Sequence, residues 1–158
     1  MINIYTSYFY QIRNFKPNMI PVSTCLSDPA WYKPPEGQEY YIDKRGVVCG
    51  LRYEPLIVQK QGTQECLGTD LLCPFVKEMK QGIICPCMQE YEHLLNTLVD
   101  KERTLKAFEF CANKFKRPFD KEKPAIVLIV YEAPNNKCSE RYALQQFFNC
   151  KELEYPIK

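Results

Sequence analysis

Glycine and histidine are scarce in this chain, which has six glycines and one histidine among its 158 residues. Neither a glycine-rich phosphate loop nor a Gly-x-Gly-x-x-Gly fingerprint occurs, which argues against dinucleotide binding of the usual kind. No Gly-x-Ser-x-Gly elbow occurs either, and a single histidine limits the hydrolase triads that the chain could assemble. The motif-defined nucleotide and hydrolase classes are therefore disfavoured, and other anionic ligands stay open.

Long apolar runs and a marked charge excess are also missing. No stretch approaches the ~18 apolar residues that a membrane span requires, and no basic region followed by an apolar run marks a secretory signal. We therefore expect a cytoplasmic protein with no membrane partner. The net charge of +2 gives no support for binding to nucleic acid, while an anionic small molecule and a protein partner both remain open.

Cysteine, by contrast, is abundant, with nine residues, an odd number. In a reducing compartment, cysteines are more often buried thiols, metal ligands or a nucleophile than disulfides. The spacing for a metal site is poor, because the chain has a C-x-C pair but no C-x-x-C knuckle. A zinc cofactor and a set of separate thiols are therefore alternative predictions. The candidate zinc ligands are Cys66, Cys73, Cys85 and Cys87.

The clearest predicted element is the aliphatic run at 125–132, which is typical of a strand buried on both faces within a parallel sheet. Apolar, β-branched and aromatic residues also predict strands at 2–9 and 19–25. A short helix at 10–15 between these two strands favours a parallel pair with a right-handed connection. The chain thus opens with one strand–crossover–strand unit.

Helical signals appear from residue 69 onward. The apolar period of 3.6 predicts helices at 90–100 and 102–115, and capping and turn residues predict further helices at about 69–80 and 138–148. The segment at about 33–87 is rich in turn formers and cysteine. Together these patterns predict one α/β domain over residues 1–158, with a small, mostly parallel central sheet flanked by helices.

Polar and aromatic side chains gather at or beyond the carboxyl ends of the predicted strands, where open parallel sheets bind their ligands. We expect residues from both ends of the chain, such as Thr6, Ser23, Glu132 and Arg141, to surround one hollow. The predicted site comprises Thr6, Ser7, Tyr8, Ser23, Trp31, Glu132, Cys138, Ser139 and Arg141.

The residues near 132–141 suggest specific chemistry. A helix N-terminus attracts anions and lowers the pKa of a cysteine, so Cys138 is a candidate nucleophile. Glu132 is a candidate general acid or base. Arg141 could clamp a phosphate or carboxylate with its guanidinium. Glu132, Cys138 and Arg141 are thus the residues predicted to react with or hold the ligand. Tyr8 and Trp31 are predicted to form the walls of the pocket.

A structural interpretation of the same residues is also open. Cys138 would then be a buried thiol, Ser139 a helix cap, and Glu132 and Arg141 an ion pair that fixes the turn. For the aromatic residues, Trp31 and its tyrosine neighbours could stack a base or a sugar. Their structural alternative is a lid packed on the core.

The same segment carries a resemblance to the Domain of Unknown Function four-eight-eight family. Members often show Tyr-Glu or Ala-Glu after a buried strand and then Cys-His-Arg on a helix; here the runs are 131–134 (Tyr-Glu-Ala-Pro) and 138–141 (Cys-Ser-Glu-Arg). The runs 4–9 and 20–23, with 29–32, are similar to phage and bacterial members. The resemblance implies an α/β fold with a pocket at the strand ends, in a bacterial host cell.

One departure limits what this resemblance implies. The chain has Cys-Ser-Glu-Arg where the family shows Cys-His-Arg, so the resemblance implies no mechanism that needs the histidine. It implies no particular reaction either.

Three functions remain as hypotheses. The first is a binder of, or an enzyme acting on, a nucleotide-like or other anionic small molecule at the strand ends. The second is a non-enzymatic, phage-type interaction protein that acts on a host system through its aromatic surface. The third is a zinc-stabilised, nucleic-acid-associated module. Composition favours the first only slightly, because the charge argues against nucleic acid and the cysteine spacing against zinc.

Overall fold

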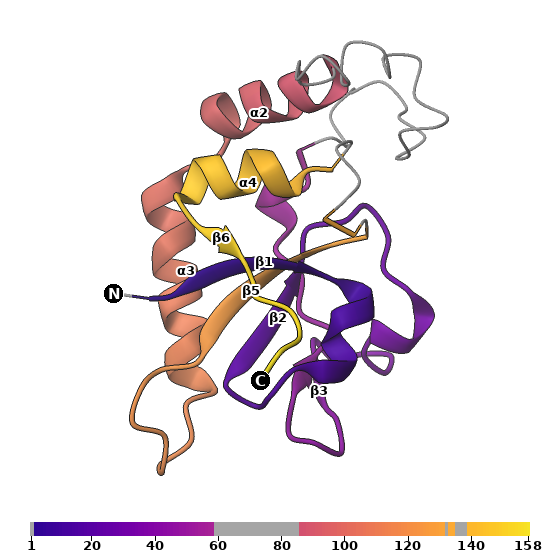
Figure 1. Ribbon diagram of the computed structural model, residues 1–158, viewed down its shortest axis with the longest axis vertical. Helices are drawn as coiled ribbons and strands as arrows, with labels where there is room; N and C mark the ends of the chain where they lie inside the picture. The colour runs from indigo at the N-terminus through magenta and orange to yellow at the C-terminus, as the bar shows by residue number, and fades with distance from the viewer. Residues whose placement is uncertain (1, 59–85, 132, 135–138) are drawn as a thin grey trace.

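A four-stranded parallel sheet forms the centre of the protein (Figure 1). The computed structural model describes residues 2–58, 86–131, 133–134 and 139–158. The strands are β1 (Ile4–Tyr8), β2 (Met19–Ser23), β5 (Ala125–Val130) and β6 (Lys151–Glu152), in the order β2-β5-β1-β6. Each of the three pairings is parallel. The predicted α/β fold with a small, mostly parallel central sheet is therefore confirmed.

Strand β5 lies between β1 and β2. Its sequence is Ala-Ile-Val-Leu-Ile-Val and all but its first residue are buried, as expected for a strand covered on both faces. Ser7 of β1 and Ser23 of β2 both stand opposite Ile129 of β5. The expectation that the first two strands form a pair is therefore wrong, although they do run parallel to each other. A third strand from the other end of the chain separates them.

Strand β2 contains a proline, and the structure shows why the sheet tolerates it. The carbonyl of Pro21 accepts a hydrogen bond from the Tyr32 hydroxyl at 3.1 Å, so this carbonyl faces away from β5. The N–H that proline lacks would point to the same outer side, where the β5 ladder does not need it.

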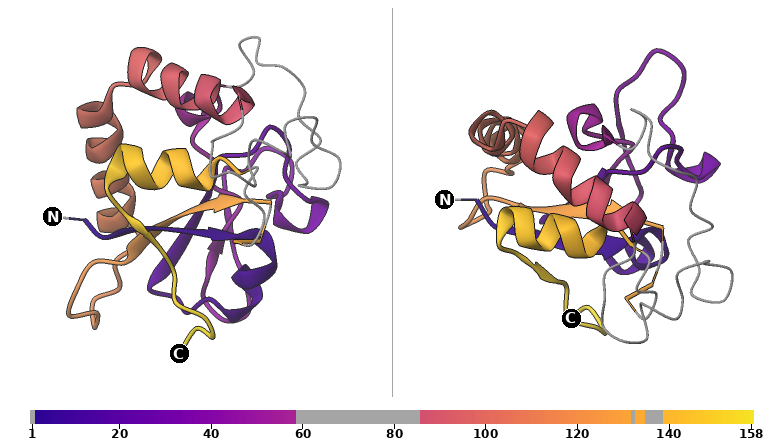
Figure 2. Two further views of the ribbon diagram at one scale, coloured as in Figure 1. Left: turned by 45° about the horizontal axis from the view of Figure 1, so that its top comes forward. Right: turned by 90° about the horizontal axis from the view of Figure 1, so that it is seen from above.

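Helices cover one face of the sheet (Figures 1 and 2). They are α2 (Pro86–Leu98), α3 (Lys101–Lys114) and α4 (Arg141–Phe148). The predicted helices at 90–100 and 102–115 are confirmed, and Asp100 caps α3 by accepting a hydrogen bond from the Arg103 N–H at 3.0 Å. None of the described helices is both long and apolar enough to cross a membrane. The last predicted helix begins later than expected, at Arg141 rather than at residue 138.

The core on the helical face joins apolar residues of α2, α3 and α4 to the sheet, with Leu95, Phe108 and Leu144 against Ile126 and Leu128. On the opposite face, the first crossover is a 3₁₀ helix, η1 (Phe9–Asn14), which packs with the short helix η2 (Ala30–Tyr32) and a small hairpin. The hairpin pairs β3 (Tyr41–Ile42) with β4 (Val48–Cys49), and η3 (Glu54–Leu56) follows. The predicted loop-rich middle thus holds only short elements in its described part, and the helix expected at 69–80 lies outside the described residues.

The end of the chain returns to the sheet as a strand that the sequence patterns did not predict. Asn149 adopts a left-handed conformation with φ of 52°, a common way to end a helix. The chain then runs parallel to β1, where Glu152 stands opposite Thr6 and the Leu153 N–H donates to the Thr6 carbonyl at 3.0 Å. This return brings Glu152 to the carboxyl ends of the strands.

Candidate functional site

Two polar clusters lie at the carboxyl ends of the strands, one at each edge of the sheet. Because Ser7 and Ser23 flank Ile129 on neighbouring strands, two strand spacings, about 10 Å, separate their backbones. The first, the Arg141 cluster, comprises Thr6, Ser7, Tyr8, Arg141, Gln145, Glu152 and Tyr155. The second, the Arg52 cluster, comprises Ser23, Cys25, Asp28, Arg52 and Glu54.

The Arg141 cluster joins β1, α4 and β6 around the carboxylate of Glu152. Arg141 is the first residue of α4, and its Nε lies 3.0 Å from Glu152 Oε1. The Thr6 hydroxyl donates to the same oxygen at 2.8 Å, and Gln145 Nε2 donates to Thr6 Oγ1 at 2.8 Å. Two of the predicted residues, Thr6 and Arg141, therefore do meet, but through a glutamate that the sequence reasoning did not include.

The other oxygen of Glu152 accepts a hydrogen bond from the Tyr155 hydroxyl. A phenol has one proton, so the Ser7 hydroxyl must be the donor in its 2.7 Å contact with Tyr155 Oη. Both hydroxyl chains thus end on the carboxyl group of Glu152, which accepts a hydrogen bond at each of its two oxygens. Burial and the hydrogen bond to Glu152 raise the pKa of Tyr155 well above its ordinary value.

The guanidinium of Arg141 is the least satisfied group in this cluster. Its side chain is 1% exposed, yet neither Nη1 nor Nη2 has a hydrogen-bond acceptor among the described residues. The Nε contact to Glu152 is an ion pair by distance, but the N–H does not make a hydrogen bond to the carboxylate. The ring of Tyr8 lies 5.5 Å from the guanidinium carbon, within cation–π range.

Other residues of the predicted site lie at or before the start of α4 in the chain. Ser139 is buried and lies before the helix, and its Oγ accepts a hydrogen bond from the Arg141 N–H at 3.3 Å. The two predicted catalytic residues, Glu132 and Cys138, lie outside the described residues. Their catalytic roles stay predictions.

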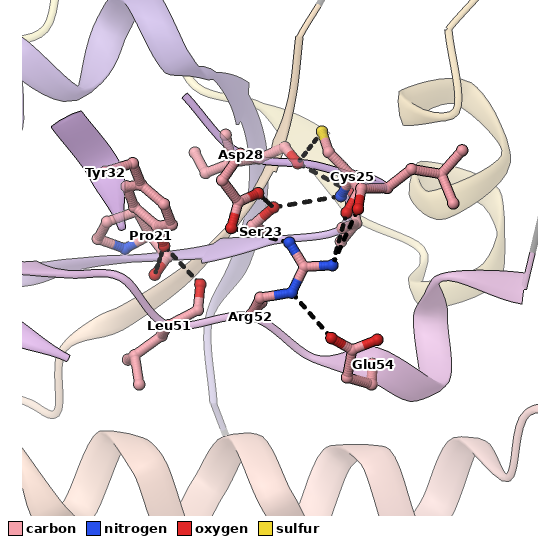
Figure 3. Close-up of polar contacts among 11 residues, drawn as sticks. Pro21, Ser23, Cys25, Asp28, Tyr32, Leu51, Arg52 and Glu54 are labelled. Atoms are coloured by element: carbon pink, nitrogen blue, oxygen red, sulfur yellow. Dashed lines mark hydrogen bonds and ion pairs between the residues drawn. The ribbon is translucent and has the colours of Figure 1, made fainter. Parts of the chain in front are cut away.

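The Arg52 cluster surrounds the buried carboxylate of Asp28 (Figure 3). Arg52 Nη1 lies 2.8 Å from Asp28 Oδ2, and the Ser23 hydroxyl donates to Asp28 Oδ1. Arg52 also donates from Nη2 to the Cys25 carbonyl at 2.9 Å and from Nε to Glu54 Oε1 at 2.9 Å. Ser23 is thus engaged on the β2 side of the sheet, and the prediction that it shares one hollow with Arg141 is corrected.

A groove of about 770 Å³ runs beside the Arg52 cluster, with Asp28, Arg52 and Glu54 on its wall. Nε and Nη2 of Arg52 donate hydrogen bonds, Nη1 forms an ion pair with Asp28, and both oxygens of Asp28 have partners. This mutual satisfaction fixes the segment after β2 to the segment after β4. It leaves little hydrogen-bonding capacity for a ligand.

Trp31 lies apart from Tyr8, with which it was predicted to form the walls of one pocket. Its indole packs edge-on against Phe9, with centroids 6.1 Å apart, on the face of the sheet opposite the helices. Tyr8 points to the helical face, because successive side chains of a strand alternate between faces. The expectation that Tyr8 and Trp31 line the same pocket is therefore wrong.

The predicted zinc ligands remain untested. Cys66, Cys73 and Cys85 lie outside the described residues, and of Cys87 only the backbone, in the first turn of α2, is described. Within the described ranges, no three histidine, cysteine, aspartate or glutamate side chains gather as metal ligands do.

The sequence reasoning missed the carboxylates that organise both clusters, Glu152 and Asp28. Tyr155 and Arg52 were missed with them. For Asp28, the signal available was its position in the turn region directly after a strand that ends in Ser23. Glu152 gave no such signal, because it lies in a polar two-residue strand after the last helix.

Comparisons of the chain with family models, with curated proteins and with solved structures find no match. The resemblance to the Domain of Unknown Function four-eight-eight family stays an expectation from the sequence.

Proposed function

We propose that the protein binds an anionic small molecule, bearing a phosphate or a carboxylate, through Arg141 at the carboxyl ends of β1 and β6. The supporting observation is the guanidinium of Arg141, which is buried while its Nη1 and Nη2 lack acceptors among the described residues. A buried donor group that lacks a hydrogen-bond acceptor costs about 1–3 kcal/mol, so native structures rarely retain one without a use.

The surroundings of Arg141 suit a ligand that is bound edge-on. Glu152 neutralises the cation from the Nε side, and Tyr8 lies within cation–π range of the guanidinium. The two Nη groups then remain as a planar pair of donors, the geometry that matches two oxygens of a phosphate or carboxylate. Glu152 in turn is held by Thr6 and Tyr155, so the arginine has a fixed internal support.

The predicted chemistry of this site remains part of the proposal. Cys138 and Glu132 precede Arg141 in the chain and are the candidate nucleophile and general acid or base for a bound anion. A Glu132→Gln or Cys138→Ser variant that retains anion binding but loses turnover would support an enzyme. The protein-partner and zinc-stabilised alternatives stay predictions, since no described feature favours either.

Anion binding is tested by thermal unfolding with inorganic phosphate or acetate at constant ionic strength. We expect one of these anions to raise Tm saturably, because a ligand that binds only the folded state stabilises it by RT ln(1 + [L]/Kd). Arg141→Met should weaken the apparent affinity at least tenfold. Arg103→Met, at an exposed arginine on α3, is the matched control and should respond as the wild type does. A saturable response that Arg141→Met leaves intact would contradict the proposal.

A further inference from the structure

A second hollow, of about 370 Å³, lies on the face of the sheet opposite the helices. It is separate from the Arg141 cluster, because none of the residues of that cluster lines it. Its volume falls at the small end of the range for ligand pockets, roughly 300 to 1,000 Å³. We call it the Trp31 hollow. Its wall includes Phe9, Arg13, Trp31, Tyr41, Asp43 and Arg45.

Aromatic rings make up one part of the Trp31 hollow. Trp31 is 53% exposed, which is unusual for so large an apolar side chain. Its position is nevertheless fixed, because its ring packs against Phe9 and Tyr32 and its carbonyl accepts a hydrogen bond from the Tyr41 hydroxyl. A rigid and accessible indole is a good stacking surface for a planar ligand.

Positive charge makes up the other part. Arg45 donates from Nε and Nη2 to one oxygen of Asp43, Oδ2, and from Nη1 to the carbonyls of Arg13 and Phe15. Arg13 donates from Nε to the Tyr10 carbonyl and lies over the ring of Tyr10 at 3.9 Å. The Nη groups of Arg13 have no acceptor among the described residues and stay available to an anion.

The charges on this wall do not cancel. Arg13 and Arg45 bring two positive charges and Asp43 one negative charge, which leaves a net charge of +1. Burial raises the pKa of the Cys49 thiol to about 11 and that of the Tyr41 hydroxyl to about 12, so both are neutral at pH 7. The hollow therefore combines a stacking surface with one uncompensated cation.

We propose that the Trp31 hollow binds a planar aromatic anion of the size of a nucleoside monophosphate, with its ring against Trp31 and its anionic group at Arg13. This site is independent of anion binding at Arg141. The small volume favours one ring system with one charged substituent over a dinucleotide.

The experiment uses the fluorescence of Trp31, which is the only tryptophan in the chain and reports on this hollow alone. Adenosine monophosphate is the probe. We expect saturable quenching by adenosine monophosphate, at least fivefold weaker binding of adenosine, and no quenching by inorganic phosphate. Arg13→Gln should weaken the binding of adenosine monophosphate at least fivefold without weakening that of adenosine. Arg103→Gln, also at an exposed arginine, is the control and should change neither.

Three outcomes would overturn this inference. The first is the absence of saturable quenching, and the second is quenching by adenosine monophosphate that Arg13→Gln leaves unchanged. The third is loss of the quenching in Arg141→Met, which would make the two regions one site. Calorimetry on a Trp31→Leu variant checks the optical result, and we expect the heat of adenosine monophosphate binding to disappear. A failure of the proposal for Arg141 would leave all of these outcomes unaffected.

Discussion

Each edge of the sheet holds an arginine beside a carboxylate, buried in the case of Asp28 and partly buried in the case of Glu152, and the two arginines differ in how they are satisfied. Arg52 is 25% exposed; its Nε and Nη2 donate hydrogen bonds to Glu54 and the backbone, and its Nη1 forms an ion pair with Asp28. Arg141 is 1% exposed, and none of its three guanidinium nitrogens makes a hydrogen bond to the described residues. The more buried arginine is thus the less satisfied one.

This difference separates a structural role from a binding role. The hydrogen bonds and the ion pair of Arg52 join the segments that follow β2 and β4, so they already stabilise the fold. Arg141 has an internal counter-charge but retains two donor groups, which is the state expected of a residue that completes its bonds with a ligand. Each prediction below tests one side of this comparison.

The largest expected effect is on the free energy of unfolding when each arginine becomes methionine. Arg52→Met should lower the free energy of unfolding by about 3–5 kcal/mol, because it leaves Asp28 buried without its cation. Arg141→Met should change the stability by no more than about 1 kcal/mol without added anion, since it also removes an unsatisfied charge. Urea denaturation in a buffer free of phosphate measures both values.

The control for this pair is Arg103→Met, at an exposed arginine, which should stay within about 0.5 kcal/mol of the wild type. If Arg141→Met proved as destabilising as Arg52→Met, the guanidinium of Arg141 would be satisfied within the protein. The comparison would then fail.

The second effect concerns the counter-charge. Glu152→Gln should destabilise the protein by about 2 kcal/mol, because it leaves Arg141 uncompensated and gives two hydroxyl donors a single acceptor oxygen. Added phosphate should then restore part of this loss, and its stabilising effect should exceed that in the wild type. Denaturation with and without phosphate measures the rescue.

The matched control is Glu102→Gln, at an exposed carboxylate on α3, which should show neither the loss nor the rescue. Equal stabilisation of Glu152→Gln and wild type by phosphate would show that the anion does not bind beside Arg141.

Local patterns predicted the parts of the fold that depend on local composition. The aliphatic run at 125–132 identified β5 as a strand buried on both faces, and apolar periodicity identified α2 and α3. Strand order was not predictable in this way, because the pairing of β1 with β5 rather than with β2 depends on contacts more than 100 residues apart in sequence. The predicted single hollow failed for this reason, since it required Ser23 to neighbour β1.

The last strand shows a different limit. Lys151 and Glu152 have neither β-branched nor aromatic side chains, and a two-residue strand has no period to detect. Its position follows from Asn149, whose left-handed conformation turns the chain out of α4 and back along β1. Asparagine is one of the few residues that adopt this conformation at low cost, so Asn149 was the available signal. Without β6 the sequence could place Arg141 at the site, but the counter-charge that it offered was Glu132 and not Glu152.

The smallest effect concerns pH and the hydroxyl that supports Glu152. Folding raises the pKa of Tyr155 above the value of about 10 for an unfolded tyrosine, through burial and the hydrogen bond to Glu152. The stability that this tyrosine contributes is therefore complete below about pH 10 and is lost as the pH rises further, by up to about 1.4 kcal/mol per pH unit. Tyr155→Phe should lower stability at pH 7 by about 1 kcal/mol, as expected for the loss of one intramolecular hydrogen bond.

Above pH 10, the stability of Tyr155→Phe should decline less steeply than that of the wild type. Cys49 and Tyr41 also have raised pKa values, about 11 and about 12, but they are present in both proteins, so the difference between the two curves isolates Tyr155. Denaturation at pH 7, 9 and 10.5 measures this difference. Parallel curves would mean that Tyr155 ionises in the folded protein as readily as in the unfolded chain. In that case its hydroxyl would not support the carboxylate on which the Arg141 cluster depends.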